Sequence, residues 1–185
     1  MLAEAHPDHA AAMAALRPVA LLSTSSMMLV VRASLPAHDP AGFARLAKSR
    51  DDLAYGSAGE GNATHLCAAE LLQRIGARAI HAPYTGGGAA LKDLLGGHID
   101  FLMTGTTATL LRQPAARVLA VTSAERSRLP GLDHLPTLGE TIADGFEYVL
   151  WQAIYVPAAT PDALVADAAG RLGAALARDE VRAAL

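Results

Sequence analysis

Short apolar runs of strand length alternate with longer stretches of helical periodicity along this chain. The short runs contain few polar positions, as strands buried on both faces do. The predicted strands are 19–22, 27–31, 53–57, 79–81, 99–103, 118–122 and 148–156, and residues 23–26 form a polar break between the first two. The predicted helices are 40–49, 63–75, 89–95, 107–111, 137–142, 161–178 and a last one that closes at Leu185. Because strands and helices alternate through short connections, the pattern predicts an α/β fold with a mainly parallel sheet.

Two helix boundaries carry specific signals. Asp39 followed by Pro40 supplies an N-cap and a first-turn proline, which together predict a helix start. Gly76 suits the left-handed position that commonly ends a helix. The helix that it ends is amphipathic, and its apolar stripe consists of Cys67, Ala68, Leu71, Leu72 and Ile75. This stripe predicts that Cys67 is a small buried residue rather than a reactive thiol.

Composition narrows the class of protein. A chain of 185 residues provides one domain or two small ones, and 52% apolar with 18% charged residues excludes a disordered segment. The net charge is −3 and the sequence has no basic block, so it lacks the positive charge that is typical of a nucleic-acid binder. No run of 18 apolar residues occurs, so we expect no membrane span.

The alanine-rich N-terminus resembles a signal peptide only superficially. It carries Glu4 and Asp8 and has no lysine or arginine before Arg17, whereas a secretory signal needs a positively charged start. We therefore expect no signal peptide in residues 1–16. The sequence over 6–9 contains two histidines and an aspartate, but a solvated chain end explains them as well as a metal site does, and we expect no metal.

Familiar catalytic and nucleotide-binding motifs are incomplete. Gly56 and Gly61 have the spacing of a phosphate-binding loop, but Asn62 and Ala63 stand where lysine and serine or threonine are required. The partial dinucleotide fingerprint in the same segment lacks its last glycine. Ser57 does not lie in a G-x-S-x-G elbow, so the sequence indicates a hydrogen-bonding hydroxyl rather than a nucleophile. We expect no catalytic residue and no cofactor.

The loop over 57–65 is the most informative segment. Ligands of such sheets bind where strands end and helices begin. The glycines allow the backbone amides to turn outward, Asn62 or Thr64 can cap the following helix, and the helix N-terminus favours negative charge. These features predict a cradle of outward-facing amides for a carboxylate or phosphate, with a plain capped turn as the alternative.

Two further loops lie at the same predicted edge of the sheet. The loop over 83–88 contains Tyr84 and a glycine triplet, which provides either a ligand site or a tight helix entry. The segment 104–107 offers hydroxyls at a strand end. Because these loops are rich in hydrogen-bond donors and contain no evident base, they indicate binding rather than turnover.

Several motifs, in order, resemble those of Bug-type proteins, the solute receptors of tripartite tricarboxylate transporters. Residues 55–66 resemble the family's Y-x-S-x-G-x-G-[ST]-x-x-H-L loop, and 81–86 resemble its H-V-P-Y-K-G. Further similar segments are 91–100 (L-x-D-L-L-G-G-x-V-D), 119–127 (L-A-V-T-S-x-x-R-S), 135–140 (V-P-T-x-x-E), and Trp151 with 157–161 (W-x-G-x-x-A-P-A-G-T-P). The similarity extends over roughly residues 16–185.

The resemblance implies a periplasmic-binding-protein type II fold with one complete lobe and the C-terminal part of the other. It divides the chain into an N-terminal remnant of lobe one with a crossover strand (1–26), a ligand-binding lobe two (27–123) and a segment that returns to lobe one (124–185). It implies a small di- or tricarboxylate as ligand, transfer of this solute to membrane permease subunits, and a periplasmic location, or a cytoplasmic one if Met1 is the true start. The site residues carried over by position are Ser57, Ala58, Gly59, Gly61, Asn62, Thr64, Tyr84, Gly86 and Thr104.

Departures from the family pattern limit this interpretation. Family members have a further segment before the point where this chain begins, so we expect a truncated receptor that binds weakly and associates with itself through an exposed lobe-one remnant. Thr85 replaces a common lysine, Thr104-Gly105 replaces a frequent Asp-Asn, and Glu60 brings negative charge to the loop. Two alternatives stay open, namely a sensing domain of a regulatory protein and an enzyme that uses Ser57 or His65.

Overall fold

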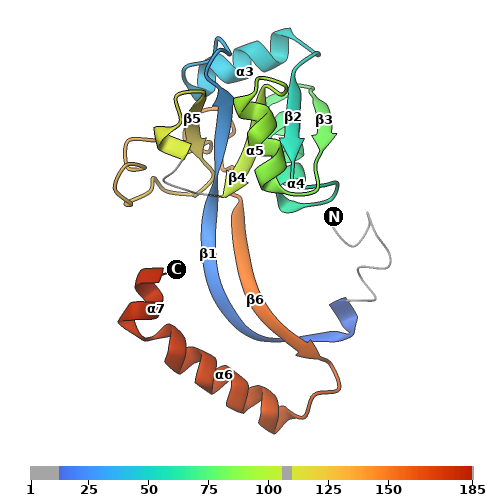
Figure 1. The fold of residues 1–185 in the computed structure, drawn as a ribbon, viewed down its shortest axis with the longest axis vertical. Coiled ribbons are helices and arrows are strands. Elements are labelled where there is room, and N and C mark those ends of the chain that lie inside the picture. Colours follow the sequence, from blue (N-terminus) through green and yellow to red (C-terminus); the bar gives the residue numbers. More distant parts are fainter. Residues whose placement is uncertain (1–12, 106–109, 185) are drawn as a thin grey trace. The chain divides into compact units, whose positions relative to one another are not determined.

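The computed structural model describes residues 13–105 and 110–184, and the chain divides into two compact units. One unit is Ser25–Leu150, and the other combines Met1–Thr24 with Trp151–Leu185. Two strands, β1 (Leu16–Arg32) and β6 (Val149–Pro157), pair with each other and have residues in both units (Figure 1).

The unit Ser25–Leu150 is built on a sheet with the strand order β3-β2-β4-β1-β5. Besides β1, its strands are β2 (Ala54–Ser57), β3 (Ile80–Pro83), β4 (Phe101–Gly105) and β5 (Ala116–Val121). Strand β2 pairs in parallel with β3 and β4, whereas β1 is antiparallel to both β4 and β5. The carboxyl ends of β2, β3 and β4 therefore lie along one edge of the sheet.

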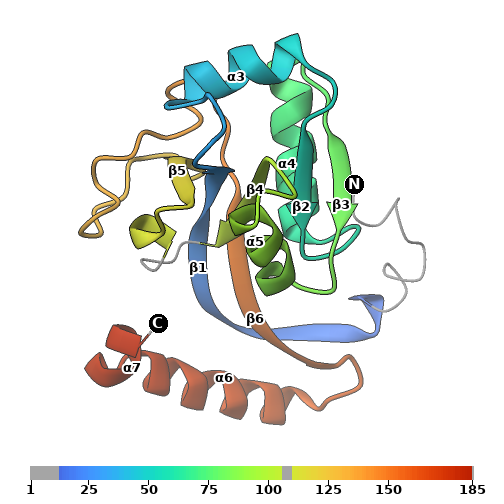
Figure 2. The ribbon, with the colours of Figure 1, turned by 45° about the horizontal axis from the view of Figure 1, so that its top comes forward.

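Helices cover both faces of this sheet. The helices of this unit are α3 (Pro40–Ser49), α4 (Ala63–Ile75) and α5 (Gly87–Leu95), with a 3₁₀ turn at Leu110–Arg112. In β1, Met27, Leu29 and Val31 pack in a core with α3 and α4, while Met28 and Val30 pack in a second core with α5. Figure 2 shows α5 in front of the sheet and α4 behind it. Successive residues of β1 thus alternate between the two cores, as expected for a strand that is buried on both faces.

The predicted helix boundaries are confirmed where local signals specify them. The Asp39 carboxylate accepts a hydrogen bond from the Gly42 amide at 2.6 Å, and α3 begins at Pro40. Helix α4 has the predicted bounds. Asn62 caps its N-terminus, and Gly76 ends it in the left-handed conformation with φ of 67°. Cys67 is buried, as its place in the apolar stripe predicts, and burial raises the pKa of its thiol.

Three predictions about the elements are wrong. Residues 19–22 and 27–31 are parts of the single strand β1, which continues through 23–26, and its antiparallel pairing makes the sheet mixed rather than mainly parallel. Residues 137–142 form turns instead of a helix, because Thr137 pairs with Val121 in a parallel bridge. The helix predicted over 107–111 lies partly outside the described residues.

The second unit contains the first part of β1, most of β6, and the helices α6 (Asp162–Leu176) and α7 (Asp179–Ala184). An ion pair of 2.5 Å joins Arg17 on β1 to Asp162 at the start of α6. Large apolar side chains are exposed in this unit: Leu21 by 57%, Trp151 by 56% and Leu164 by 60%. In the part of the chain described here, no helix combines the length and the apolar character needed to cross a membrane.

Candidate functional site

A small cavity lies where β2 and β4 end and where α4 and α5 begin. Its lining residues are Gly56, Ser57, Ala58, Thr64, Gly87, Ala90, Leu102, Met103 and Thr104. Its volume of about 10 Å³ is at the lower limit for holding one water molecule. The structure thus brings four of the predicted site residues, Ser57, Ala58, Thr64 and Thr104, around a space the size of a single oxygen atom.

Thr64 and Asn62 fix the start of α4. The Thr64 hydroxyl accepts a hydrogen bond from the Ala58 amide at 2.8 Å and donates one to the Asn62 side-chain oxygen at 3.1 Å. The same Asn62 oxygen accepts the Thr64 amide at 3.1 Å. This arrangement is an N-terminal cap that also holds the preceding loop, since Ala58 lies on the far side of the turn.

Three further loop amides are paired within the loop. The Gly59 amide donates to the Ser57 hydroxyl at 3.2 Å, the Gly61 amide to Nδ1 of His65 at 3.0 Å, and the Asn62 amide to the Gly59 carbonyl at 3.2 Å. Gly59 and Gly61 have φ of 128° and 71°, values that favour glycine. The predicted cradle of outward-facing amides is therefore wrong for Ala58, Gly59 and Gly61, because side chains of the loop itself accept these hydrogen bonds.

Ser57 contacts a histidine that lies on another strand, and no motif in the sequence predicts this contact. The Ser57 hydroxyl lies 2.7 Å from Nε2 of His81 on β3 and 3.0 Å from the Gly59 carbonyl. A serine beside a histidine is the arrangement of an activated nucleophile. However, Ser57 is only 1% exposed, and among the described residues no carboxylate hydrogen-bonds to His81. The geometry fits a hydroxyl that stabilises the loop.

His81 belongs to a stack of rings beneath the loop. Its ring centroid lies 4.9 Å from that of Tyr55 and 3.9 Å from that of His65, and the two imidazoles are parallel. Tyr55 and His81 are partners in the register of β2 and β3, so the sheet places them side by side. Burial, and then the neighbouring His65, lower the pKa of His81 below its usual value.

Tyr84 and Gly86 do not line the cavity. The Tyr84 hydroxyl donates to the Asp93 carboxylate at 2.8 Å, and burial followed by this contact raises the pKa of Tyr84. Its ring covers Gly56, where an added Cβ would lie 3.3 Å from the ring and 2.5 Å from Ile99. Gly86 is the residue before α5, and its carbonyl accepts hydrogen bonds from the first turn of that helix.

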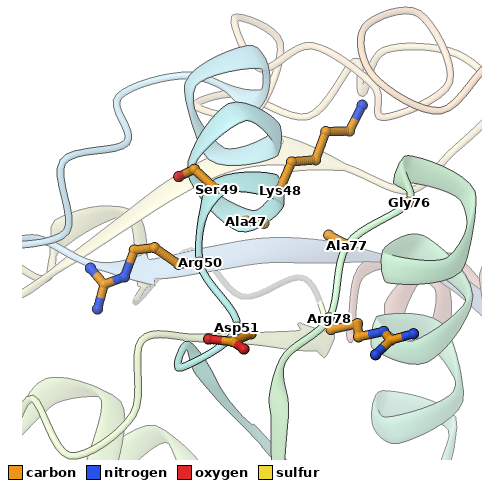
Figure 3. A pocket seen from close by; sticks show the side chains of 8 residues that line it. All are labelled: Ala47, Lys48, Ser49, Arg50, Asp51, Gly76, Ala77 and Arg78. Atoms are coloured by element: carbon orange, nitrogen blue, oxygen red, sulfur yellow. The ribbon is translucent and has the colours of Figure 1, made fainter.

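A more open hollow of about 410 Å³ lies at the end of α3 and the end of α4 (Figure 3). Three cationic residues, Lys48, Arg50 and Arg78, lie around it, and Figure 3 shows Arg50 and Arg78 pointing to opposite sides. Arg50 is paired with Asp52 at 2.8 Å. Because the carboxyl ends of two helices lie here, the helix dipoles disfavour a bound anion. This hollow is therefore not the candidate carboxylate site.

The described residues contain no cluster of three or more His, Cys, Asp or Glu side chains placed to hold a metal ion. The histidines of residues 6–9 lie outside the described residues.

Comparison with known proteins matches residues 9–182 to the family described as "Tripartite tricarboxylate transporter family receptor". A "UPF0065 protein in tcbD-tcbE intergenic region" of Pseudomonas sp. strain P51 is 31% identical over 170 residues, which are 91% of this chain and 51% of that protein. A second UPF0065 protein, from Agrobacterium vitis, is 33% identical over 77% of this chain and 42% of its own length. The chain spans about half the length of these relatives.

Solved structures show the same relation. "R. palustris Rpa4515 with adipate" aligns with a TM-score of 0.81 at 30% identity over 90% of this chain and 56% of that one. "Structure of periplasmic binding protein BugD" aligns with a TM-score of 0.79 at 30% identity over the same shares of the two chains. "MatC (Rpa3494) from Rhodopseudomonas palustris with bound malate" aligns with a TM-score of 0.81 at 27% identity, covering 90% of this chain and 57% of that one. The periplasmic-binding-protein fold is thereby confirmed.

Proposed function

This chain belongs to the tripartite tricarboxylate transporter receptor family, and we propose that it binds a small di- or tricarboxylate through the lobe formed by residues 27–123. Segments 1–26 and 124–185 contribute the part of the other lobe. The family is one of solute receptors and not a class of enzymes. The solute is passed to the membrane subunits of a transporter, and the protein works in the periplasm without catalysing a reaction.

The observation that carries the proposal is the convergence of hydroxyls on the cavity at the ends of β2 and β4. Ser57, Thr64 and Thr104 line it, and its size suits one carboxylate oxygen or one bridging water. A carboxylate held by hydroxyls, with no acid or base in contact, is bound without being transformed. Two structural neighbours have names that state adipate and malate as their bound molecules, and both are dicarboxylates.

Direct ligand contacts are assigned to the predicted residues that line the cavity, Ser57, Ala58, Thr64 and Thr104. The other predicted residues, Gly59, Gly61, Asn62, Tyr84 and Gly86, are not among the lining residues and are assigned to support of the surrounding loops. The loop amides of Ala58, Gly59 and Gly61 act indirectly, because they hold the loop in shape through its own side chains. Glu60 is exposed, so its negative charge lies in solvent and does not oppose an anion in the cavity.

Calorimetric titration of the 185-residue chain with malate, adipate and a tricarboxylate tests the proposal. We expect saturable heat with at least one of them, because a carboxylate oxygen in the cavity can accept from Thr104 and can compete with the Gly59 carbonyl and the Asn62 side-chain oxygen for the Ser57 and Thr64 hydroxyls. Lys48→Ala at the open hollow is the control variant, and it leaves the affinity unchanged. A monodisperse sample that gives no saturable heat with any of these compounds would refute the proposed binding.

Self-association is a second expected property, through the unit that combines 1–24 with 151–185. The strands β1 and β6 expose Leu21 and Trp151 beside an open hollow of about 400 Å³, and exposed apolar surface of this kind favours association. We expect the apparent mass in light scattering to rise with protein concentration and the double variant Leu21→Ser, Trp151→Ser to reduce this rise. Leu129→Ser, at a singly exposed leucine of the other unit, is the matched control. Equal curves for both variants contradict the assignment.

A further inference from the structure

A pair of stacked histidines supports the loop from below. His65 lies in the first turn of α4 and His81 on β3, and their parallel rings are 3.9 Å apart between centroids. Each ring holds a different part of the loop. Nδ1 of His65 accepts the Gly61 amide at 3.0 Å, and Nε2 of His81 lies 2.7 Å from the Ser57 hydroxyl. The pair thus contacts the loop at Ser57, which lines the cavity, and at Gly61.

The Gly61 contact depends on the protonation state of His65. A backbone N–H can only donate, so Nδ1 must carry a lone pair, as it does in one tautomer of neutral imidazole. An imidazolium carries protons on both nitrogens and cannot accept this hydrogen bond. Charge on one ring also disfavours charge on the other, because the two rings are in contact.

We propose that His65 and His81 are positioning residues for the loop over 57–64, and that uptake of a proton by the pair releases the Gly61 amide and opens the loop. The consequence for ligand rests on the proposed carboxylate site, whereas the release of the loop does not. Histidine is the side chain whose charge ordinarily changes between pH 5 and pH 8.

Few other titratable groups face the pair. Tyr55 of β2 stacks on His81, and burial raises the pKa of its hydroxyl, so it stays neutral in this range. Glu60 of the loop acts on His81 from a distance and opposes the lowering of its pKa. Helix α4 contributes one group that acts on the pKa of His81, namely His65, whose ring is stacked on that of His81.

The lowered pKa of His81 gives the direction of the pH effect on stability, whereas release of the Gly61 amide requires a proton on His65. The unfolded chain takes up this proton at a pH of about 6.5, before the folded chain does. The stability contributed by neutral His81 is therefore complete above that pH, and it is lost as the pH falls from about 6.5 through the lower pKa of the folded state. Acid thus weakens the packing beneath the loop.

Protonation of the pair could raise or lower the affinity for a carboxylate, and the proposal predicts that the affinity falls. A positive charge beneath the cavity would attract a carboxylate and tighten binding as the pH falls. Release of Gly61 instead removes the shape of the site and weakens binding. We expect weakening, because neither histidine is among the residues that line the cavity, whereas both contact the loop.

The first experiment needs no ligand. In the ¹⁵N-labelled chain of 185 residues, the hydrogen bond from Gly61 to His65 gives a nitrogen–nitrogen coupling between the Gly61 amide and Nδ1 of the ring. We expect this coupling at pH 7.5, together with slow exchange of the Gly61 amide. At pH 5 we expect the coupling to vanish and the protection factor of the Gly61 amide, its exchange rate relative to that of an unstructured chain at the same pH, to fall. A coupling that persists at pH 5 overturns the proposal.

Two variants of His65 separate positioning from simple packing. His65→Asn introduces a side-chain amide oxygen near the former Nδ1 position, and this group cannot be protonated, so the variant keeps the Gly61 amide protected at both pH values. His65→Phe keeps a stacked ring without an acceptor, so it shows rapid Gly61 exchange at both. If both variants retain the pH response of the native chain, another group is responsible and the proposal fails.

Binding of malate provides the second readout. From pH 7.5 to pH 5.5 we expect a loss of affinity of about two- to tenfold in the native chain, the effect of losing one hydrogen bond. His65→Asn corrects for protonation of malate itself and shows a smaller loss. Affinity that rises with acid overturns the proposal. If malate gives no heat at any pH while the Gly61 coupling behaves as expected, the loop device stands and the carboxylate proposal fails.

Discussion

Thr64→Val is expected to weaken carboxylate binding by about tenfold or more, since loss of an interaction of about 1–3 kcal/mol changes an equilibrium constant by that factor. Valine keeps the shape of threonine but removes the hydroxyl that accepts the Ala58 amide and donates to Asn62. The Ala58 amide, which is partly buried, then lacks its partner, and the Asn62 cap loses one of its two donors. The cavity loses one hydroxyl of its lining.

Thr64→Ser is the matched control, because serine retains the hydroxyl and removes only a methyl group. Calorimetry with malate and adipate measures the affinity, and urea unfolding monitors the fold at the same time. Since the cap contributes to α4, we also expect Thr64→Val to lower the free energy of unfolding by about 1–2 kcal/mol, a loss that the serine variant avoids. If valine and serine variants bind and unfold alike, the hydroxyl has no role in the loop.

Local signals were sufficient to predict α4 but not the contacts of the loop before it. Asn62, the apolar stripe and Gly76 are all read along one short segment, and the helix has the predicted bounds. The partner of Ser57 depends instead on the register of β2 and β3, which places position 81 beside Tyr55. No property of the segment 57–64 reveals that register.

The outward-facing amide cradle was a wrong prediction for a similar reason. Glycines at 59 and 61 indicate correctly that the backbone takes unusual conformations there, and both have positive φ. The sequence does not say which acceptor meets each amide. Thr64 and His65 of the first helical turn accept the Ala58 and Gly61 amides, and Ser57 accepts the Gly59 amide, so these three amides are hydrogen-bonded without a ligand.

The other wrong predictions concern segments whose structure depends on pairing with residues far away in the sequence. The polar residues 23–26 look like a break between strands, but β1 continues through them. Residues 137–142 have a helical pattern, but Thr137 forms a parallel bridge with Val121 at the end of β5 and the segment forms turns. In both cases pairing with a strand far away in the sequence overrides the local pattern.

Phe101→Ala is expected to lower the free energy of unfolding by about 3–5 kcal/mol, the usual cost of truncating a fully buried phenylalanine. Phe101 of β4 is 0% exposed and meets two rings, Phe43 of α3 at 4.9 Å in a T-shaped contact and Tyr55 of β2 at 5.4 Å in a stacked one. Tyr55 in turn stacks on His81. Removal of the Phe101 ring therefore leaves a cavity in the core and takes away one side of the support of Tyr55.

Urea unfolding measures the loss, and Phe101→Leu is the control, with a smaller decrease because leucine fills part of the space. Because Phe101, Tyr55, His81 and His65 form one continuous row of rings from the core to the loop, we also expect the alanine variant to accelerate exchange of the Gly61 amide at pH 7.5 more than the leucine variant does. A loss of stability below about 1 kcal/mol would show that the core collapses around the missing ring. Gly61 exchange that does not change despite a large loss of stability would show that the loop is held by His65 and α4 alone, independently of the core beneath the sheet.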